Sequence, residues 1–598
     1  MKFINTKVTA MASAVSLAVT ASVSMANGPG GGSEPYEIWG SDQSNSVRDV
    51  GSRGVNGSYM WIWDGKDVGN QIKKGTPAQP LGCDGSNTPG DGPCDLNVVF
   101  PGNLQESEDD GQTTTGETLA SVGSFGRLHG MLPDPQGLYQ NVNSFVTGSN
   151  PGGYVGIVDA RTKEAVALFR VTKTNAASGG GRSLHMSFWN KDGSALLLAN
   201  LHGRILERID ITRDADGNIT DAVYNRSASL NVGKTGDIGG ILDSASVFLG
   251  TNAQGSDMIG SVVGSYANAD LGNLTPDGYC REDGCTDAGA KPSTGRGVNV
   301  IICPIVSDNG NTYITMGGGG LLVADSTATP MSLVAEYDRA TVNGAGCGGV
   351  EDDNGTVWLN AGVSASGAGA TQSTFSMYAI DDNAISAGVA GGGVNAMNTP
   401  APNTVFKDVG NTMTIGNDFG PASNGTGQLP GETTRRDAHG AVITNDKRYV
   451  HNVDRIQNNV EVFDTASQAH VGTYDLTSAN GQGGGMGPCA AASVNDDPYL
   501  PGNDVAPDLM DATPDGKYLV VALRGPTPVS VTHSAQGSCP GVGVIQLRQG
   551  GKSGKLLTVL RSTNTVDNAP VSAPGGYPYA GAERSDVHGA SVISKKNW

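Results

Sequence analysis

The sequence predicts an all-β fold, a β-propeller of seven blades, and three observations lead to this prediction. A short phrase recurs seven times, each time with a polar residue at the start of an apolar stretch and a turn about eight positions later. The chain contains 89 Gly but only 6% aromatic residues, a balance that suits tight turns better than helices. Sustained apolar periodicity of 3.6 residues is absent from the sequence. We call the seven polar residues head residues: His129, His185, Cys303, Cys347, His439, Asp508 and His588.

Each repeat contains the parts of a four-stranded blade. After the head and its turn, a second strand is predicted at 138–142, 195–199, 312–316, 356–359, 448–453 and 517–522. A third strand, usually ending in Asp, is predicted at 154–159, 205–210, 321–325, 375–381 and 460–464. A further turn and a fourth strand, such as 165–169 or 472–476, complete the unit. Four antiparallel strands repeated in this way are typical of a propeller blade.

Segments from both ends of the sequence predict how the ring closes. The repeat that begins at His588 is one strand long, and a single unpaired strand would leave an exposed sheet edge. Residues 36–39 suit a second strand, and residues 59–64 suit a third strand that ends in Asp64. We therefore expect the N-terminal strands to complete the last blade. Segment 241–263 is apolar enough to form a further blade, so eight blades are the alternative.

Residues 1–26 have the pattern of a secretory signal peptide, with Lys2 and Lys7 before an apolar run and Ala26 at the expected cleavage site. Residues 27–598 are predicted to form one propeller domain with loop insertions near 233–296, 382–434 and 478–505. We expect a periplasmic or secreted protein, without a membrane-spanning segment in the mature chain. The formal net charge of −20 argues against nucleic acid and anionic membranes as partners.

Eight Cys in an exported chain predict disulfides. Two predicted pairs are close in sequence and lie in loops, and a third pair flanks the strand at 518–522. The last two Cys are head residues, and three alternatives are open for them: a fourth disulfide, buried thiols or metal ligands. The two pairs close in sequence are Cys83 with Cys94 and Cys280 with Cys285, the pair flanking the strand is Cys489 with Cys539, and the head residues are Cys303 and Cys347.

Three phrases resemble the repeat units of YVTN-type β-propellers of exported bacterial proteins. They are His-Gly-Ala-Val at 439–442, Val-Phe-Asp-Thr at 462–465 and Asp-Gly-Lys-Tyr-Leu-Val-Val-Ala at 515–522. The resemblance covers nearly all of the predicted mature chain and implies a propeller fold. It implies no single function, because such propellers serve as binding modules, scaffolds and enzymes.

The head residues predict a metal site. The first strand of each propeller blade lines the central channel, so the heads would face one another around one opening. Imidazole, thiolate and carboxylate are ligands of transition metals, and His with Cys suits copper, zinc or iron better than calcium. We predict copper as the metal, with these ligands: His129, His185, His439, His588 and Cys347.

The alternative is that the heads form hydrogen bonds to the turn of a neighbouring blade, with no metal. Asp508 fits this alternative best, and a strict register would place Ile302 rather than Cys303 at the head position. The remaining four His are predicted to serve packing or to lie on the surface: His202, His451, His470 and His533.

An Arg residue shortly precedes each of the four head His. In a chain this acidic, they predict an electropositive opening that attracts a small anion to the metal. Asp437 and Asp586, two residues before their His, are alternative partners for the Arg or would orient the imidazoles. The predicted anion-binding residues are Arg127, Arg182, Arg436 and Arg584.

The architecture resembles that of periplasmic copper propeller enzymes such as nitrous oxide reductase and thiocyanate dehydrogenase, which draw His ligands from several blades. This resemblance implies a copper-dependent oxidoreductase acting on a small anionic substrate. The chain departs from those families because it lacks a His-His dipeptide, and it lacks the Cys-Ser-Ser-Cys signature of methanethiol oxidases. The competing hypothesis is a non-catalytic propeller that binds a protein, glycan or cell-surface component through its inserted loops.

Two Asp-rich segments, 84–91 and 214–221, resemble calcium loops in composition. Calcium in these surface loops is therefore a further expected ligand, and plain turns are the alternative because neither segment has the Gly spacing of an EF-hand. The sequence carries no convincing hydrolase or nucleotide-binding motif.

Overall fold

The structure is a computed structural model that describes most of the chain after residue 34. The described residues are 35–43, 59–83, 89–100, 125, 127–145, 153–174, 183–201, 203–232, 240–241, 245–246, 261–262, 265–268, 300–317, 319–344, 346–362, 375–390, 394–408, 436–455, 457–476, 505–525, 537, 539–562, 571–573, 577–579 and 585–598. The predicted signal peptide at 1–26 lies outside them. Among the described helices, none has the length and apolar character needed to cross a membrane.

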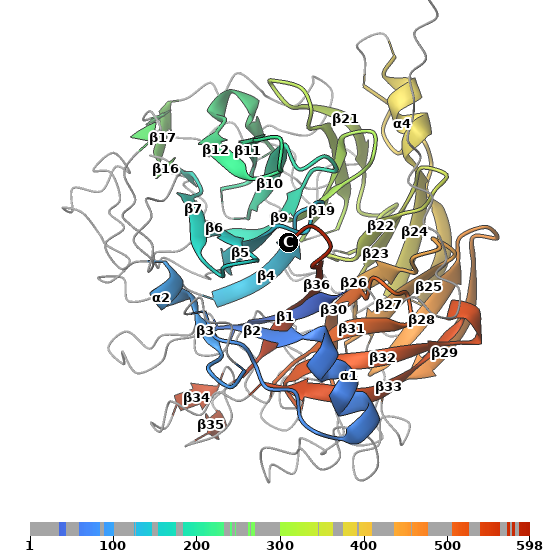
Figure 1. Cartoon of the computed structure of the whole chain (residues 1–598). Coiled ribbons are helices and arrows are strands. Elements are labelled where there is room, and N and C mark those ends of the chain that lie inside the picture. The colour runs from blue at the N-terminus through green and yellow to red at the C-terminus, as the bar shows by residue number, and fades with distance from the viewer. Residues whose placement is uncertain are drawn as a thin grey trace, which may run out of the picture. The chain divides into compact units, whose positions relative to one another are not determined.

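Seven sheets, each built on four antiparallel strands, are arranged around a common centre (Figure 1), which confirms the predicted seven-bladed propeller. The innermost strands are β4 (Arg127–Pro133), β9 (Leu184–Trp189), β18 (Ile301–Val306), β22 (Gly349–Glu351), β26 (Ala438–Ile443), β30 (Pro507–Ala512) and β36 (Val587–Ser594). The second strands, in the same order, are β5 (Tyr139–Phe145), β10 (Ala195–Asn200), β19 (Asn311–Met316), β23 (Thr356–Ala361), β27 (Tyr449–Asp454), β31 (Tyr518–Leu523) and β1 (Tyr36–Asp42). We number the blades that start at β4, β9, β18, β22, β26 and β30 as blades 1 to 6, and call the blade of β36 the closing blade.

The outer strands complete each blade. The third strands are β6 (Tyr154–Asp159), β11 (Ile205–Arg213), β20 (Leu321–Asp325), β24 (Phe375–Asp381), β28 (Asn459–Asp464), β32 (Gly541–Arg548) and β2 (Tyr59–Asp64). The fourth are β7 (Ala165–Arg170), β12 (Ile219–Tyr224), β21 (Ser332–Tyr337), β25 (Asn403–Asp408), β29 (Ala469–Asp475), β33 (Ser553–Arg561) and β3 (Cys94–Asp95). The α-helices among the described residues are α1 (Gly65–Lys74), α2 (Leu96–Val99) and α4 (Asp382–Gly388).

The segment considered for an eighth blade instead extends blade 1. Strands β15 (Ala245–Ser246) and β16 (Ser261–Val262) add to the outer edge of that sheet, where β16 pairs with β7. Strands β14 (Gly240–Ile241) and β17 (Ser265–Asn268) form a small sheet with β8 (Lys173–Thr174). Two further short pieces are β13 (Leu230–Asn231), which pairs with β11, and the hairpin of β34 (Val571–Ala573) and β35 (Tyr577–Tyr579).

Asp side chains hold the turn before the second strand and the turn after the third strand. In blade 1, the Asp134 carboxylate accepts hydrogen bonds from the backbone N–H groups of Leu138 and Tyr139, and Gly137 adopts a φ of 70°. Asp159 ends the third strand and accepts a hydrogen bond from the N–H of Arg161. These turns need an acceptor side chain and a residue that tolerates positive φ, which explains why Asp and Gly recur at fixed places in the repeat.

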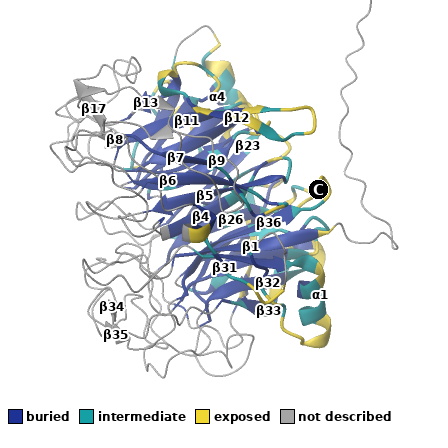
Figure 2. Ribbon diagram, turned by 60° about the vertical axis from the view of Figure 1, so that its left-hand side comes forward, coloured by how far each residue is buried: buried dark blue, intermediate teal, exposed yellow. Residues whose placement is uncertain are grey.

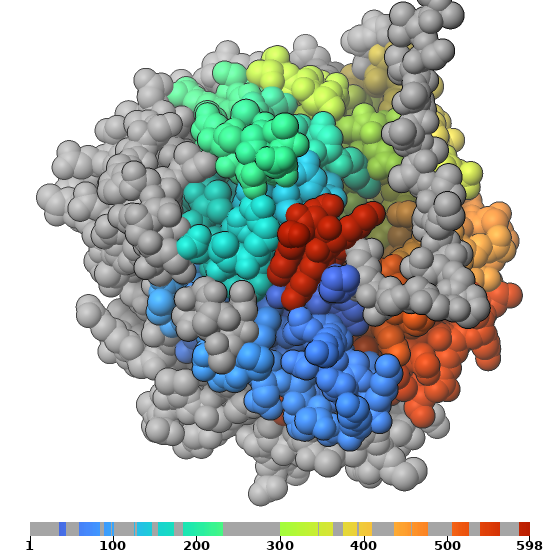
Figure 3. Space-filling view, in the orientation of Figure 1, coloured from blue at the N-terminus to red at the C-terminus, as the bar shows by residue number. Residues whose placement is uncertain are grey.

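The closing blade joins the two ends of the chain, as predicted. β1 pairs with β36 on one side and with β2 on the other, both antiparallel. Lys595 adds ion pairs to Glu37 at 3.0 Å and to Asp64 at 2.8 Å. Figure 3 shows the red C-terminal segment lying beside the blue N-terminal residues near the middle of this face. Closure therefore rests on a full strand pairing, reinforced by charge.

The blade faces pack against one another through buried strands. Figure 2 shows the inner strands largely in dark blue, with exposed residues at α1, α4, some outermost strands and some turns. Trp39, Trp63 and Trp358 are fully buried, and burial of a large apolar side chain contributes about 1.5–3 kcal/mol.

Two disulfides are described in full, Cys83–Cys94 and Cys303–Cys347. Cys539 is also disulfide-bonded, and its predicted partner Cys489 lies outside the described residues, as does the predicted pair Cys280 and Cys285. The insertions predicted near 233–296 and 478–505 fall almost entirely outside the described residues. The one near 382–434 contains α4 and β25, so part of it belongs to blade 4 itself.

Candidate functional site

Head residues lie at the inner ends of six blades where the innermost strand loses register with the second strand. In blade 1, Leu128 pairs with Ser144 and Met131 with Val142, so β4 carries one residue more than β5 across this step. Such a bulge takes a side chain out of the regular alternation and re-aims it. The shift occurs at the corresponding place around His185, Cys303, His439, Asp508 and His588. In blade 3 the first residue of the step is Ile302 and Cys303 is the second, so a strict register does place Ile302 at the head position.

Glycines next to the heads let the inner strands approach closely. A Cβ on Gly440 would lie 2.3 Å from the Asp508 carbonyl oxygen of the neighbouring blade, and one on Gly348 would lie 2.4 Å from that of His439. Real Cβ atoms do not come this near to backbone atoms, so these positions require Gly. The head side chains are thereby brought within contact distance of one another.

The imidazole rings of the four head His form a continuous series at the centre of the propeller. The ring centroids of His129 and His588 are 3.9 Å apart, those of His129 and His185 4.2 Å, and those of His439 and His588 5.5 Å. Phe145 covers the series at 4.9 Å from His129. The predicted convergence of these four residues is therefore observed.

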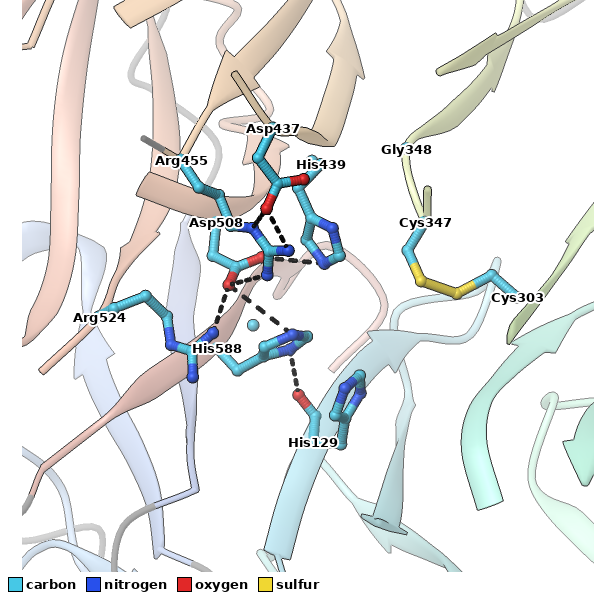
Figure 4. A network of polar contacts seen from close by, with 12 residues as sticks. His129, Cys303, Cys347, Gly348, Asp437, His439, Arg455, Asp508, Arg524 and His588 are labelled. Atoms are coloured by element: carbon cyan, nitrogen blue, oxygen red, sulfur yellow. Dashed lines mark hydrogen bonds and ion pairs between the residues drawn. A yellow bond between two sulfur atoms is a disulfide. The ribbon is translucent and has the colours of Figure 1, made fainter. Parts of the chain in front are cut away.

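Asp508, assigned to a structural role from its sequence, lies inside this group. Its Oδ1 is 3.1 Å from His439 Nε2, and its Oδ2 is 3.7 Å from His588 Nε2. One ligand atom from each of the three residues lies within 4.8 Å of the other two, and all three side chains are buried. Figure 4 shows the three side chains pointing toward one another.

The orientation of His588 is set by a hydrogen bond between blades. His588 Nδ1 lies 2.7 Å from the His129 carbonyl oxygen, and because a carbonyl only accepts, Nδ1 carries the proton. In the neutral ring, Nε2 then keeps its lone pair and directs it toward Asp508. The alternative considered from the sequence, hydrogen bonding between blades, thus accounts for one nitrogen of His588 and leaves the other for a ligand.

Two buried Arg residues hold the carboxylates in place (Figure 4). Arg455 contacts Asp437 at 2.7 Å and Asp508 at 3.4 Å. Arg524 contacts Asp508 at 2.9 Å and Asp586 at 2.6 Å. Three carboxylates thus share two guanidinium groups, and a buried cluster with an excess of negative charge favours a cation.

Neither Arg was predicted, and a signal existed in the sequence. Arg455 and Arg524 each follow directly after the second strand of consecutive blades. Repetition of a charged residue at one structural position is the same pattern that identified the heads. The proposed alternative role of Asp437 and Asp586 was pairing with Arg, and the pairing occurs with these two Arg.

Burial keeps the imidazoles neutral. Loss of hydration lowers the pKa of His129 and of His588 well below 6.5, and the neighbouring His and Arg groups lower them further. The pKa of His185 falls to about 3, mainly through burial and secondly through Arg455. Burial raises the pKa of Asp508, while Arg455 and Arg524 act in the opposite direction. Neutral imidazole is the form that binds metals.

Cys347 is bonded to Cys303, so its sulfur is not a thiolate in this structure. Both sulfurs lie beside His185, with Cys303 Sγ at 3.7 Å and Cys347 Sγ at 3.9 Å from His185 Nδ1. Of the three alternatives for these Cys, the disulfide is the one observed. The predicted ligands therefore fall into two groups, His439 and His588 with Asp508, and His185 with the disulfide, while His129 belongs to neither group.

Of the four Arg predicted to attract an anion, only the side chain of Arg436 is described. Arg436 is buried and its guanidinium contacts Asp408, Asp454 and Glu461. Arg127 is the first residue of β4. Arg182 and Arg584 lie outside the described residues, so anion binding stays a prediction.

The other His have structural partners where they are described. His451 is buried between the Tyr474 hydroxyl and the Gly551 carbonyl, and His470 lies 2.7 Å from Glu461. His202 and His533 lie outside the described residues.

Of the two calcium candidates, segment 214–221 contains the turn between β11 and β12 and the start of β12. The Asp214 carboxylate there accepts hydrogen bonds from the N–H groups of Asp216 and Asn218. Most of segment 84–91 lies outside the described residues, and calcium at either place stays a prediction.

No protein-family model and no curated protein sequence matches the chain, so membership of the YVTN-type family stays a prediction. Among solved structures, the chain is similar to a protein from Lactobacillus plantarum, with 10% identity, a TM-score of 0.43, and coverage of 94% of this chain and 99% of that one. It is also similar to the periplasmic gluconolactonase of Pseudomonas aeruginosa, with 9% identity, a TM-score of 0.40 and the same coverages. Hydrazine synthase of Kuenenia stuttgartiensis matches with 14% identity and a TM-score of 0.33 over 70% of this chain and 76% of that one. These similarities concern the fold alone.

Proposed function

We propose that the protein is an exported metalloprotein that binds a transition-metal ion at the ring centre through His439, Asp508 and His588. One observation carries the proposal: ligand atoms of these three buried residues lie within 4.8 Å of one another. They come from blade 5, blade 6 and the closing blade, so the ion would bridge strands that are far apart in sequence.

The electrostatics support a cation at this position. The Nε2 lone pair of His588 and the carboxylate of Asp508 face each other at 3.7 Å, so both groups direct electron-pair donors into the same space. Burial makes such an arrangement costly unless a proton or a cation compensates it. The Arg455 and Arg524 contacts hold the carboxylate in a fixed direction, as partners of metal ligands commonly do.

Two imidazoles and one carboxylate suit copper, zinc or iron. Copper is the metal expected from the sequence, and when bound it would supply one-electron redox chemistry. The wider form of the proposal is an oxidoreductase that acts on a small anionic substrate. In that role His129, whose imidazole packs against that of His588 with a ring-centroid distance of 3.9 Å, would help to keep the His588 imidazole in position.

Metal analysis of matched variants tests the proposal. The full-length protein is loaded with copper, dialysed, and analysed by mass spectrometry for metal per protein. We expect near-stoichiometric retention by the wild type and by His451→Ala, which removes an equally buried His away from the site. The double variant His439→Ala with His588→Ala should lose the metal.

Retention of copper by the double variant, or absence of copper, zinc and iron from the loaded wild type, would refute the metal site. The second result is the one expected from a propeller that acts only as a binding module. Circular dichroism spectra of all three proteins establish that the comparison is made between folded chains.

A further inference from the structure

We propose that reduction of the Cys303–Cys347 disulfide creates a second metal site, in which both thiolates and His185 bind a soft cation such as monovalent copper. This inference stands independently of metal binding at His439, Asp508 and His588. It gives a role to the two head Cys that the proposed function does not use.

The geometry places three soft or borderline donors in one group. The ligand atoms of His185, Cys303 and Cys347 lie within 4.8 Å of one another. They come from the inner ends of blades 2, 3 and 4, which are neighbours in the ring. Two thiolates and one imidazole form a set that selects monovalent copper or zinc over calcium and magnesium.

The disulfide decides whether the site exists. A disulfide sulfur carries no negative charge, whereas the thiolate is the form that ligates metals. Reduction by a dithiol adds two electrons and two protons to the S–S bond, and the dithiol leaves as its own disulfide. The two new thiols release their protons when the cation binds. The bonded state therefore keeps the site closed, and the reduced state opens it.

The surroundings favour this role over a purely structural cross-link. Both sulfurs face the His185 ring, which is only partly buried, while Cys303 itself is fully buried. His129 lies between the two groups, with ring centroids 4.2 Å from His185 and 3.9 Å from His588. A cation bound at the reduced site would thus lie one imidazole away from the first group.

The experiment measures monovalent copper binding to the full-length protein before and after reduction with a phosphine, in the absence of oxygen. Bicinchoninate serves as the coloured competitor. We expect the reduced wild type to bind one equivalent more than the oxidised protein. The variant Cys303→Ser with Cys347→Ser keeps the other Cys and should gain no equivalent at this site, so it corrects for reduction elsewhere.

Two further variants separate the outcomes. His185→Ala retains the disulfide and should weaken the added equivalent by at least about tenfold. The variant His439→Ala with His588→Ala should keep the added equivalent, whether or not the proposed function is correct. Three results would overturn the second site. The first is no gain in the wild type, and the second is an equal gain in the wild type and in the Cys303→Ser, Cys347→Ser variant. The third is loss of the gain in His439→Ala with His588→Ala. Circular dichroism confirms that each variant is folded.

Discussion

His451 offers a direct test of how burial sets the charge of an imidazole in this fold. It is fully buried on β27, with Nε2 at 2.8 Å from the Gly551 carbonyl and Nδ1 at 3.0 Å from the Tyr474 hydroxyl. Burial lowers its pKa to about 4, whereas the unfolded chain has the ordinary value of about 6.5. As the pH falls below 6.5, the unfolded state gains a proton that the folded state does not accept. The free energy of unfolding therefore decreases until the pH reaches the folded pKa.

The expected size follows from the difference in pKa. A difference of about 2.5 corresponds to roughly 3 kcal/mol, lost between about pH 6.5 and pH 4. His451→Gln removes the titration and keeps an N–H donor for Gly551. Urea unfolding of both proteins, followed by Trp fluorescence at about pH 7 and pH 4, should show the wild-type advantage shrinking by this amount. An unchanged difference between the two proteins across this range would refute the reasoning.

Two further variants test the contacts that build the ring centre. Gly440→Ala forces a Cβ to within 2.3 Å of the Asp508 carbonyl, and we expect a loss of about 1–3 kcal/mol in urea unfolding together with weaker copper retention. Gly69→Ala is the matched control, because a Cβ at this position in α1 has open space. It should be neutral or stabilising by about 0.5–1 kcal/mol. Equal losses of stability in both variants would contradict the close-approach argument. Arg455→Met removes the 2.7 Å ion pair from the buried Asp437 carboxylate and should cost about 3–5 kcal/mol. The double variant Arg455→Met with Asp437→Asn should recover part of this loss. Strictly additive losses in that pair, measured by urea unfolding, would show that the two side chains do not act together.

The blade architecture was readable from the sequence because its signals are local. The third strands β6, β20 and β24 have the predicted bounds, since each ends at an Asp that its own turn requires. The closing blade was also predicted correctly. The last repeat supplied a single strand that needed partners, and the N-terminal segment supplied two strands that belonged to no other repeat. Such signals involve residues a few positions apart, so no knowledge of the ring is needed.

The arrangement of the site was only partly readable. The convergence of the four His followed from the repeat, but the bulges that aim them do not alter the apolar pattern enough to be seen. The His-Gly dipeptides were a hint, because Gly next to a head permits the close approach of strands. Asp508 was assigned to a structural role because its partners lie on other blades. Arg524 and Asp586 are 62 residues apart, a pairing that only the ring geometry creates.

The closing blade also determines when the site can form. Ser41 and Gly589 contact each other across 548 residues of chain, and His588 lies on the strand that makes this contact. Until β36 pairs with β1, His588 has no fixed position beside His129 and Asp508. Ring closure and completion of the ligand set are therefore one event in folding. A metal ion at this place would report that the whole ring has assembled, and would selectively stabilise closed rings over open ones.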